Sequence, residues 1–445
     1  MPPQLITRAI SRIEGHGRLL IELDEAGNVA KARLQVLELR GFEKLLEGRP
    51  AEEVPRIVSR ICGICPWMHH VASAKAVEAC FGLTPPPAAR MLTELMFTLA
   101  HAADHILHIF LMALPDFLEL PQPRGILGLV NAHPRVARSA AKARALAQSL
   151  IEEFSGRAVH PVAVVPGGFC RSMDEPTRNQ MLAGAKQLLE LVTEGWQFLR
   201  ANVLPKLQEL APQEELTTGF LGMVSPGEGA LELFEGMLRL MHPQGGITDF
   251  PYEQYSEYLG EHVEPWTHGK FPYARIWGEG FSLQPPNPRG LYRTNALARI
   301  NVCDFIPTPL AQKELELLRQ RFGRPIHYSF FYHWARAIEL LFCCERTIQL
   351  LENPRITSKD VRVEAIPRAG RGIGCVEAPR GTLIHDYTTD EQGFITRANL
   401  IVGTTHNLGP INASIQALAT KVVRHGKLDE HALHQVEMIV RAYDP

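Results

Sequence analysis

Long stretches of helical periodicity constrain the fold of this chain more than any other feature. Apolar residues recur at helical spacing over about 87–114, 131–156, 175–211, 227–241, 309–322 and 331–352. Pro115 ends the first stretch, and Asp174 followed by Pro176 begins the third. The 445 residues contain no internal repeat, low-complexity tract or Ser/Gly linker. The sequence therefore predicts one mainly α domain over residues 1–445, of the α+β class, with long helices at its centre.

β-structure is expected at the edges of a helical core that covers about 70–355. Two alternating runs around a short polar turn predict a β-hairpin over about 18–38. Residues 359–404 mix short β-type runs with glycine-rich turns, and about 408–443 has helical periodicity again. Residues 242–300 are rich in Pro, Gly and aromatic residues and show little periodicity. The sheets are therefore predicted to be small and peripheral.

Charge and hydropathy argue against nucleic-acid and membrane binding. Lys and Arg number 46 and Asp and Glu 48, so the net charge of −2 provides no basic surface. The most apolar stretch, Ala88–Leu114, carries several charged residues and histidines, which predicts a buried helix and no membrane span. The first eight residues show neither an apolar signal segment nor a twin arginine, which favours the cytoplasm.

Of the eight cysteines, only Cys62 and Cys65 stand at a spacing typical of metal or redox sites. Thiolates suit zinc, iron–sulfur clusters, copper(I) or nickel, and Gly63 lets the intervening loop curl. A Cys-x-x-Cys pair can belong to a zinc knuckle, a cluster site or a thioredoxin-like dithiol, or arise by chance. A zinc knuckle needs a second pair, and a dithiol needs a βαβ context; the sequence provides neither. The spacing thus predicts half of a metal site.

The remaining cysteines do not form a disulfide framework, so they are predicted to be small buried apolar residues with reduced thiols. They are Cys80, Cys170, Cys303, Cys343, Cys344 and Cys375.

The wider pattern Arg-x-Cys-Gly-x-Cys-x-x-x-His over residues 60–69 resembles the N-terminal motif of nickel–iron hydrogenase large subunits. Further segments that resemble this family follow one another along the whole chain: Arg12–His16, Arg40–Glu43, Asp104–His108, Ala378–Gly381 and Asp444-Pro445. Together they are far more specific than an isolated Cys-x-x-Cys. The resemblance implies the large-subunit fold of this family and the reversible heterolytic cleavage of H2 into protons and electrons.

The resemblance also implies roles for individual residues. Cys62 matches a terminal nickel thiolate and Cys65 a thiolate that bridges nickel to an iron carrying CO and cyanide ligands. His69 matches a residue that orients the bridging thiolate through a hydrogen bond. Glu14 matches a glutamate that passes protons out of the site. Glu43 matches a carboxylate ligand of a structural magnesium ion.

A second set of residues matches family positions that cover the two metals on one side, and this set is called the canopy. Arg380 matches a guanidinium that lies above the two metals, and Asp104 matches the carboxylate that orients it. Pro379 and Asp444 match the neighbours that complete this canopy.

Without the resemblance, simpler interpretations apply. Glu14 would be a solvated carboxylate at a strand end, and Glu43 an exposed helix residue. His101, His105 and His108 share one helical face, which suits either a zinc site or, more commonly, packed and hydrogen-bonded histidines.

The family's second motif begins with Asp-Pro and continues with Cys-x-x-Cys-x-x-His, which supplies two further thiolates. The sequence ends at Asp444-Pro445, before the first of them, and two thiolates do not complete a four-thiolate nickel site. The leading explanation is a selenocysteine codon read as a stop. A separate short peptide, an incomplete sequence and a nickel-free hydrogenase-like scaffold, such as the quinone-site subunit of respiratory complex I, are the alternatives.

Partners follow from the same resemblance. The chain has no additional cysteine motif for an iron–sulfur cluster, so electrons require an iron–sulfur small subunit in an obligate heterodimer. The run over residues 65–76 resembles the cytoplasmic, cofactor-coupled branch, and within it the methyl-viologen-reducing type associated with heterodisulfide reductase. An NAD- or deazaflavin-reducing module is the alternative. Maturation proteins are expected to install the metals.

Overall fold

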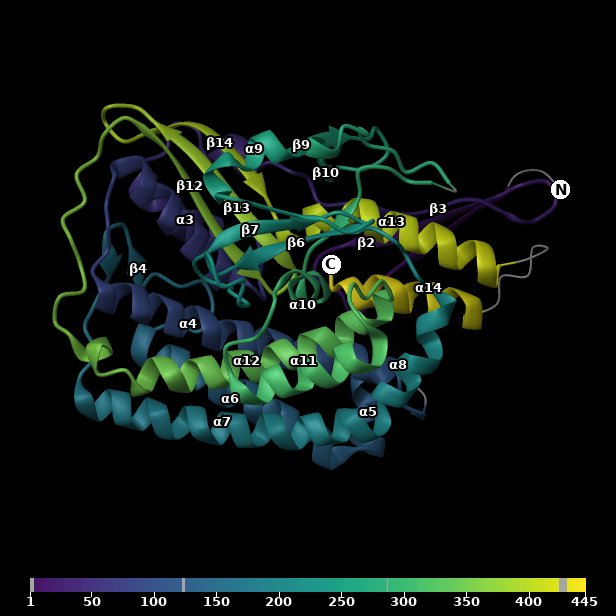
Figure 1. Cartoon of the computed structure of the whole chain (residues 1–445), viewed down its shortest axis with the longest axis horizontal. Helices are drawn as coiled ribbons and strands as arrows, with labels where there is room; N and C mark the ends of the chain where they lie inside the picture. Colours follow the sequence, from purple (N-terminus) through teal and green to yellow (C-terminus); the bar gives the residue numbers. More distant parts are fainter. Residues whose placement is uncertain (1–3, 122–124, 286, 424–429) are drawn as a thin grey trace.

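The structure is a computed structural model that describes residues 4–121, 125–285, 287–423 and 430–445. Four long helices contact one another in a ring and fill the lower half of Figure 1: α4 (Pro87–Ile106), α6 (Pro134–Ser155), α7 (Glu175–Asn202) and α12 (Tyr332–Glu352). Small sheets lie above this layer. The predicted mainly α architecture of the α+β class is confirmed.

Several helices begin or end close to the residues that the sequence marks as helix start or stop signals. The periodic stretch at 309–322 forms α11 (Pro309–Phe322). The stretch at 175–211 is divided at Val203 into α7 and α8 (Leu204–Leu210), and Pro205 lacks the N–H that would continue the ladder of hydrogen bonds. Beyond Ile106, α4 widens into a π-helical segment, Leu107–Ala113. Such segments are frequent near functional sites.

Two helix predictions are wrong. The stretch at 227–241 forms no helix: Gly227 and Gly229 have φ values of +79° and +71°, outside the helical region, and the apolar run enters strand β7 (Met237–Met241). The stretch at 408–443 is not one helix but two, α13 (Gly403–Val422) and α14 (Glu430–Tyr443), because the chain is already extended at Val423. Residues 424–429 lie outside the described part of the chain.

The centre of the chain also contains more β-structure than its weak periodicity indicated, so the helical core predicted over 70–355 is interrupted. A mixed sheet has the order β11-β6-β7-β8, with β6 and β11 parallel. A separate hairpin pairs β9 with β10. Their bounds are β6 (Gly219–Val224), β8 (Ile247–Phe250), β9 (Leu259–Val263), β10 (Lys270–Ala274) and β11 (Tyr292–Arg293).

Two antiparallel sheets complete the scaffold of the site. The predicted N-terminal hairpin is confirmed as β2 (Gly17–Leu23) and β3 (Val29–Val36), and β1 (Gln4–Ala9) adds an unpredicted strand. The segment predicted as mixed β-structure forms β12 (Gly370–Ala378), β13 (Gly381–Thr389) and β14 (Ile395–Ile401). Shorter elements connect these units: α1 (Phe42–Leu46), α2 (Val54–Val58), α5 (Ile126–Ala132), α9 (Tyr255–Tyr258), α10 (Ala296–Val302), β4 (Val164–Val165) and β5 (Gly168–Phe169).

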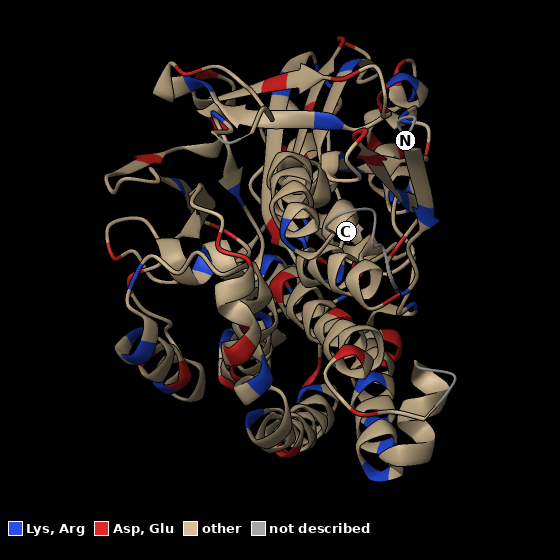
Figure 2. Cartoon of the chain, turned by 90° about the vertical axis from the view of Figure 1, so that its right-hand side faces the viewer, with Lys and Arg blue, Asp and Glu red and all other residues tan. Residues whose placement is uncertain are grey.

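The apolar segment around α4 is a core element. The stretch Pro87–Asp116 is long and apolar enough to cross a membrane, yet 83% of its 18-residue apolar window is buried inside the protein. Its polar residues face other parts of the chain, as described below. Lys, Arg, Asp and Glu are interspersed along helices and loops in Figure 2, in agreement with the near-neutral net charge.

Helix α3 (Pro66–Phe81) packs on strand β12 backbone to backbone. Glycine occupies alternate positions of this strand, at Gly370, Gly372 and Gly374. A Cβ atom on Gly374 would lie 1.9 Å from the carbonyl oxygen of Ala72 in α3, closer than any real contact. Because Cys65 immediately precedes α3 and Arg380 follows β12, this contact fixes both residues on one rigid unit.

The glycine contact predicts a stability change. Gly374→Ala is expected to destabilise the protein by roughly 1–3 kcal/mol, because the added methyl group has to push α3 away from β12. Gly41→Ala is the matched control, since Gly41 has a negative φ and no atom within 4 Å of its added Cβ. Urea unfolding of the purified variants measures the difference; equal midpoints would contradict the proposed close packing.

Candidate metal centre

A cavity of about 400 Å³ brings together residues from both ends of the chain. Six of the predicted site residues line it, together with Pro445: Glu14, Glu43, Cys62, Cys65, His69 and Arg380. Of the other three, Asp104 and Asp444 are the ion-pair partners of Arg380, and Pro379 directly precedes it in the chain. The structure thus brings the sequence-predicted set into one place.

The two cysteines of the motif form a buried pair. Their Sγ atoms are 2.6 Å apart, and the backbone N–H of Cys65 donates to Cys62 Sγ at 3.0 Å. The Cys65 thiol donates to Cys62, and this hydrogen bond and the charge of Arg380 lower the pKa of Cys62 despite its burial. The same hydrogen bond and burial raise the pKa of Cys65. The pair therefore favours one thiolate, on Cys62, facing the cavity.

Glu14 reaches the cysteine loop from the segment between β1 and β2. Its Oε1 atom accepts a hydrogen bond from the N–H of Gly63 at 2.9 Å and lies 4.0 Å from Cys62 Sγ. The Glu14 backbone N–H donates to the carbonyl oxygen of Pro445 at 3.2 Å. The carboxylate is thus held at the outer limit of a hydrogen bond to the Cys62 sulfur, so that a small movement of either side chain allows proton exchange between them.

Arg380 is fixed above the cysteines by two carboxylates. Its guanidinium donates to both oxygens of Asp104, at 2.9 and 3.1 Å, and to Asp444 Oδ1 at 3.1 Å. This bidentate geometry defines both the position and the orientation of the positive charge. Burial raises the pKa of Asp444 to about 7, against the opposing charges of Arg380 and Arg336.

Comparisons with known proteins identify the family. A family model described as nickel-dependent hydrogenase matches residues 40–145, and one described as HoxL-like matches residues 6–39. The F420-non-reducing hydrogenase vhu of Methanococcus voltae has a subunit that is 42% identical over 415 residues, which cover 92% of this chain and 96% of that protein. The chain belongs to the nickel-dependent hydrogenases. Another relative, the NAD-reducing hydrogenase HoxS subunit beta of Cupriavidus necator, is 32% identical over 100% of this chain and 94% of its own length.

Solved structures confirm the hydrogenase large-subunit fold. An NAD+-reducing nickel–iron hydrogenase in its H2-reduced state superposes with a TM-score of 0.91 at 34% identity, covering 99% of this chain and 98% of that one. The nickel–iron–selenium hydrogenase of D. vulgaris Hildenborough gives a TM-score of 0.80 at 22% identity, over 100% and 98% of the two chains. This second match supports the fold alone.

In this hydrogenase chain, His69 has a partner that the motif did not predict. Its Nδ1 atom lies 3.2 Å from His385 Nε2, and His385 Nδ1 lies 2.6 Å from the hydroxyl of Tyr387. Burial lowers the pKa of His69 to about 3, so the ring is neutral. No hydrogen bond joins His69 to Cys65 among the described residues, and its role in orienting the thiolate stays a prediction.

Glu43 also lines the cavity, where it lies among cationic side chains. Its Oε1 atom accepts from the N–H of Leu400 at 3.0 Å and from Lys270 Nζ at 3.3 Å, and its Oε2 atom pairs with Arg40. Burial opposes ionisation of this carboxyl, but the hydrogen bond from Arg40, the Leu400 N–H and the Lys270 charge lower its pKa overall.

Arg299, which the sequence did not single out, holds the turn that carries Arg380. Arg299 donates to Glu339 Oε2 at 2.6 Å and to Glu377 Oε2 at 2.7 Å. It also donates to the carbonyl oxygen of Ala378 at 3.0 Å, two residues before Arg380. Arg299 and both of its ion-pair partners are fully buried. The guanidinium thus links helices α10 and α12 to the β12–β13 turn.

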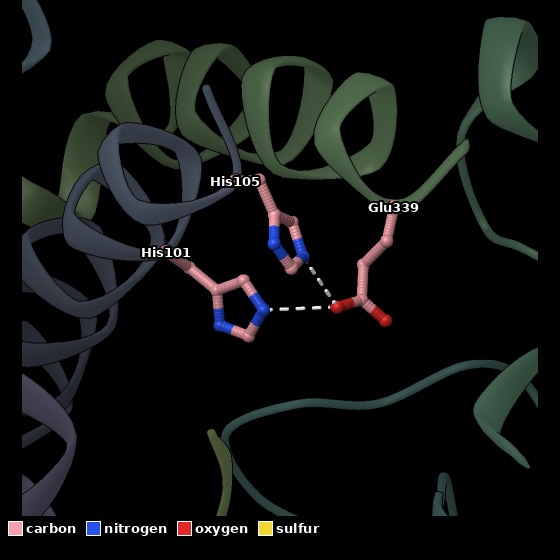
Figure 3. Close-up of side chains that lie close together, drawn as sticks. All are labelled: His101, His105 and Glu339. Carbon is pink, nitrogen blue, oxygen red and sulfur yellow. Dashed lines mark hydrogen bonds and ion pairs between the residues drawn. The ribbon is translucent and has the colours of Figure 1, made fainter. Parts of the chain in front are cut away.

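The histidines of α4 belong to this buried network. His101 and His105 donate through Nε2 to Glu339 Oε1, at 2.9 and 2.8 Å (Figure 3). Their ligand atoms lie within 4.8 Å of one another, as in a metal site. Arg299 already pairs with both oxygens of Glu339, however, and its charge would repel a cation. His108 bonds a backbone carbonyl of α14 instead. The contacts fit hydrogen-bonded histidines and not a zinc site.

The other cysteines mostly behave as predicted. Cys80, Cys303, Cys343, Cys344 and Cys375 are buried. The prediction is wrong for Cys170, which is exposed because the chain turns to the surface directly after the buried strand β5, at Cys170 and Arg171.

Replacement of Arg299 tests whether its guanidinium stabilises the β12–β13 turn that carries Arg380. Lysine keeps the charge but cannot reach two carboxylates and a carbonyl together, so Arg299→Lys is expected to cost roughly 1.5–3 kcal/mol for each charged hydrogen bond lost. The exposed pair Arg135–Glu194 supplies the control, Arg135→Lys. Urea denaturation of both variants measures the effect, and an Arg299→Lys protein as stable as the control would refute this role.

Proposed function

We propose that this chain is the H2-cleaving subunit of a nickel–iron hydrogenase, with Cys62 and Cys65 as two of the ligands of its metal centre. The observation that carries the proposal is the buried thiol pair beneath Arg380, at the wall of a cavity of about 400 Å³. Thiolates are the ligands that nickel and iron share in such sites. The 42% identity to the hydrogenase relative of Methanococcus voltae supports the same activity.

The residues present fit half of the metal centre. Both thiols are more than 90% buried and their sulfur atoms converge, as two ligands of one centre would. The hydrogen bond from Cys65 and the positive charge of Arg380 favour the deprotonated form of Cys62, which metal binding requires. The CO and cyanide ligands of the iron rest on the family resemblance alone.

We infer that two further thiolate or selenolate ligands complete the centre. Pro445 lines the same cavity as the cysteines, and the cavity volume of about 400 Å³ leaves space for further ligands beside them.

The nickel–iron centre, when bound, supplies the heterolytic cleavage of H2 and takes up its electrons. The residues of this chain stabilise the thiolate charge and transfer the proton. Arg380 holds a fixed positive charge beside the Cys62 sulfur, which stabilises the thiolate. Glu14 Oε1, 4.0 Å from that sulfur, is positioned to take the proton released by H2 cleavage from a terminal thiolate or selenolate and to pass it outward. Asp104 and Asp444 act on Arg380 by fixing its position.

The partners and the compartment are part of the proposal. Electrons are expected to leave through an iron–sulfur small subunit, because the sequence has no further cysteine pair at cluster spacing. We favour a cytoplasmic, methyl-viologen-reducing type that works with heterodisulfide reductase, as the identity to the F420-non-reducing relatives suggests. An NAD-linked module is the alternative, supported by the NAD-reducing relative.

Single replacements of the two cysteines test the activity. Cys62→Ser and Cys65→Ser are each expected to reduce H2-dependent reduction of methyl viologen to background, because a serine hydroxyl does not replace a thiolate ligand. The exposed Cys170 supplies the control, Cys170→Ser, which should retain full activity. Retained H2 oxidation in either motif variant would exclude the proposed ligand role. A wild-type complex that never oxidises H2 would favour a nickel-free scaffold.

The role of Glu14 predicts a separate effect. A glutamine at this position could still accept the hydrogen bond from Gly63 but could not carry a proton, so Glu14→Gln is expected to lower H2 oxidation by about 10²–10⁴-fold. Nickel content should not change, since Glu14 is not a proposed ligand. Activity and nickel are measured on the same preparations, and an active Glu14→Gln enzyme would contradict the proton route.

A further inference from the structure

Lys270 places a buried ammonium group in the wall of the metal cavity. Its side chain is only 5% exposed and comes from the first residue of β10. The Nζ atom donates to Asn399 Oδ1 at 3.0 Å and to Glu43 Oε1 at 3.3 Å, and it pairs with Glu261. An ammonium group has three donors, and here each has an acceptor.

The acceptors are the kind of ligands that a divalent cation would use. Glu43, Glu261 and Asn399 offer two carboxylates and one amide oxygen, the hard donors that magnesium prefers. They come from α1, β9 and β14, three segments that are far apart in the sequence. The Lys270 ammonium holds these segments together, as a structural ion would.

The surroundings of Glu43 leave little room for a second cation. Its Oε1 atom already accepts from the Leu400 N–H and from Lys270, and its Oε2 atom pairs with Arg40. Magnesium requires a nearly octahedral shell at about 2.0–2.1 Å, with ligand lone pairs free to face it. Two positive side chains on one carboxylate would also repel the ion. The magnesium site implied by the family resemblance therefore does not fit these residues.

We propose that the Lys270 ammonium takes the place of that structural magnesium ion, and that Glu43, Glu261 and Asn399 form an internal ammonium site that binds no divalent cation. The positive charge that compensates the carboxylates of Glu43 and Glu261 then comes from a side chain of the protein and not from a bound ion. This inference concerns the part of the cavity wall that Glu43 and Lys270 form, and its test does not depend on H2 oxidation.

The test uses the native complex, purified in buffer without magnesium and dialysed against EDTA. The wild type is expected to retain no magnesium by elemental analysis, and its melting temperature should be the same in EDTA and in millimolar MgCl2. Lys270→Met removes the charge but keeps the length of the side chain. It should melt at a lower temperature than wild type in EDTA and recover part of the loss in MgCl2, because the freed oxygens can then take the ion.

Lys44→Met is the matched control, because Lys44 is 84% exposed and its ion-pair partner in the described part of the chain is Glu47. This variant should melt like the wild type in both buffers. Two results would overturn the proposal: about one magnesium per nickel in the wild type that is lost in Glu43→Gln, or a Lys270→Met protein that melts like the wild type in EDTA. The wild-type metal content decides the question even if Lys270→Met does not fold.

Discussion

The fixed guanidinium of Arg380 is the interaction on which the site depends. A buried cation is tolerated only where carboxylates compensate it, and Asp104 and Asp444 do so from α4 and from the segment after α14. The hydrogen bond from Cys65 together with this charge lowers the pKa of Cys62, which favours the thiolate that metal binding requires. The core helix α4 and the C-terminal segment therefore have to meet at Arg380.

The rest of the fold holds this arrangement in place at two levels. Glycines in β12 let α3 approach the strand directly, which sets the cysteine loop against the turn that carries Arg380. Arg299 then ties that turn to α10 and α12 through Glu339 and Glu377. The backbone contact between α3 and β12 and the buried ion pairs of Arg299 therefore both keep the cysteine thiols at a fixed distance from the Arg380 guanidinium.

Local sequence patterns predicted what is local in the structure. Helices such as α11 and α12 were predictable because their periodicity is strong and proline or glycine marks their ends. The strands of residues 219–274 were not, because short apolar runs suit helix and strand equally and the glycine turns decide between them. The metal-site residues were recognisable only as a motif. Lys270 and Arg299 were not, since Lys270 meets Glu43 across 227 positions and Arg299 meets Glu377 across 78.

The nickel content of the native complex, purified anaerobically, tests the account most directly. The measurement is made by elemental analysis on preparations whose H2 oxidation is assayed in parallel. If Cys62 and Cys65 belong to a nickel–iron centre, active preparations will hold about one nickel per chain, and activity will scale with nickel. A complex that oxidises H2 without nickel would contradict the account.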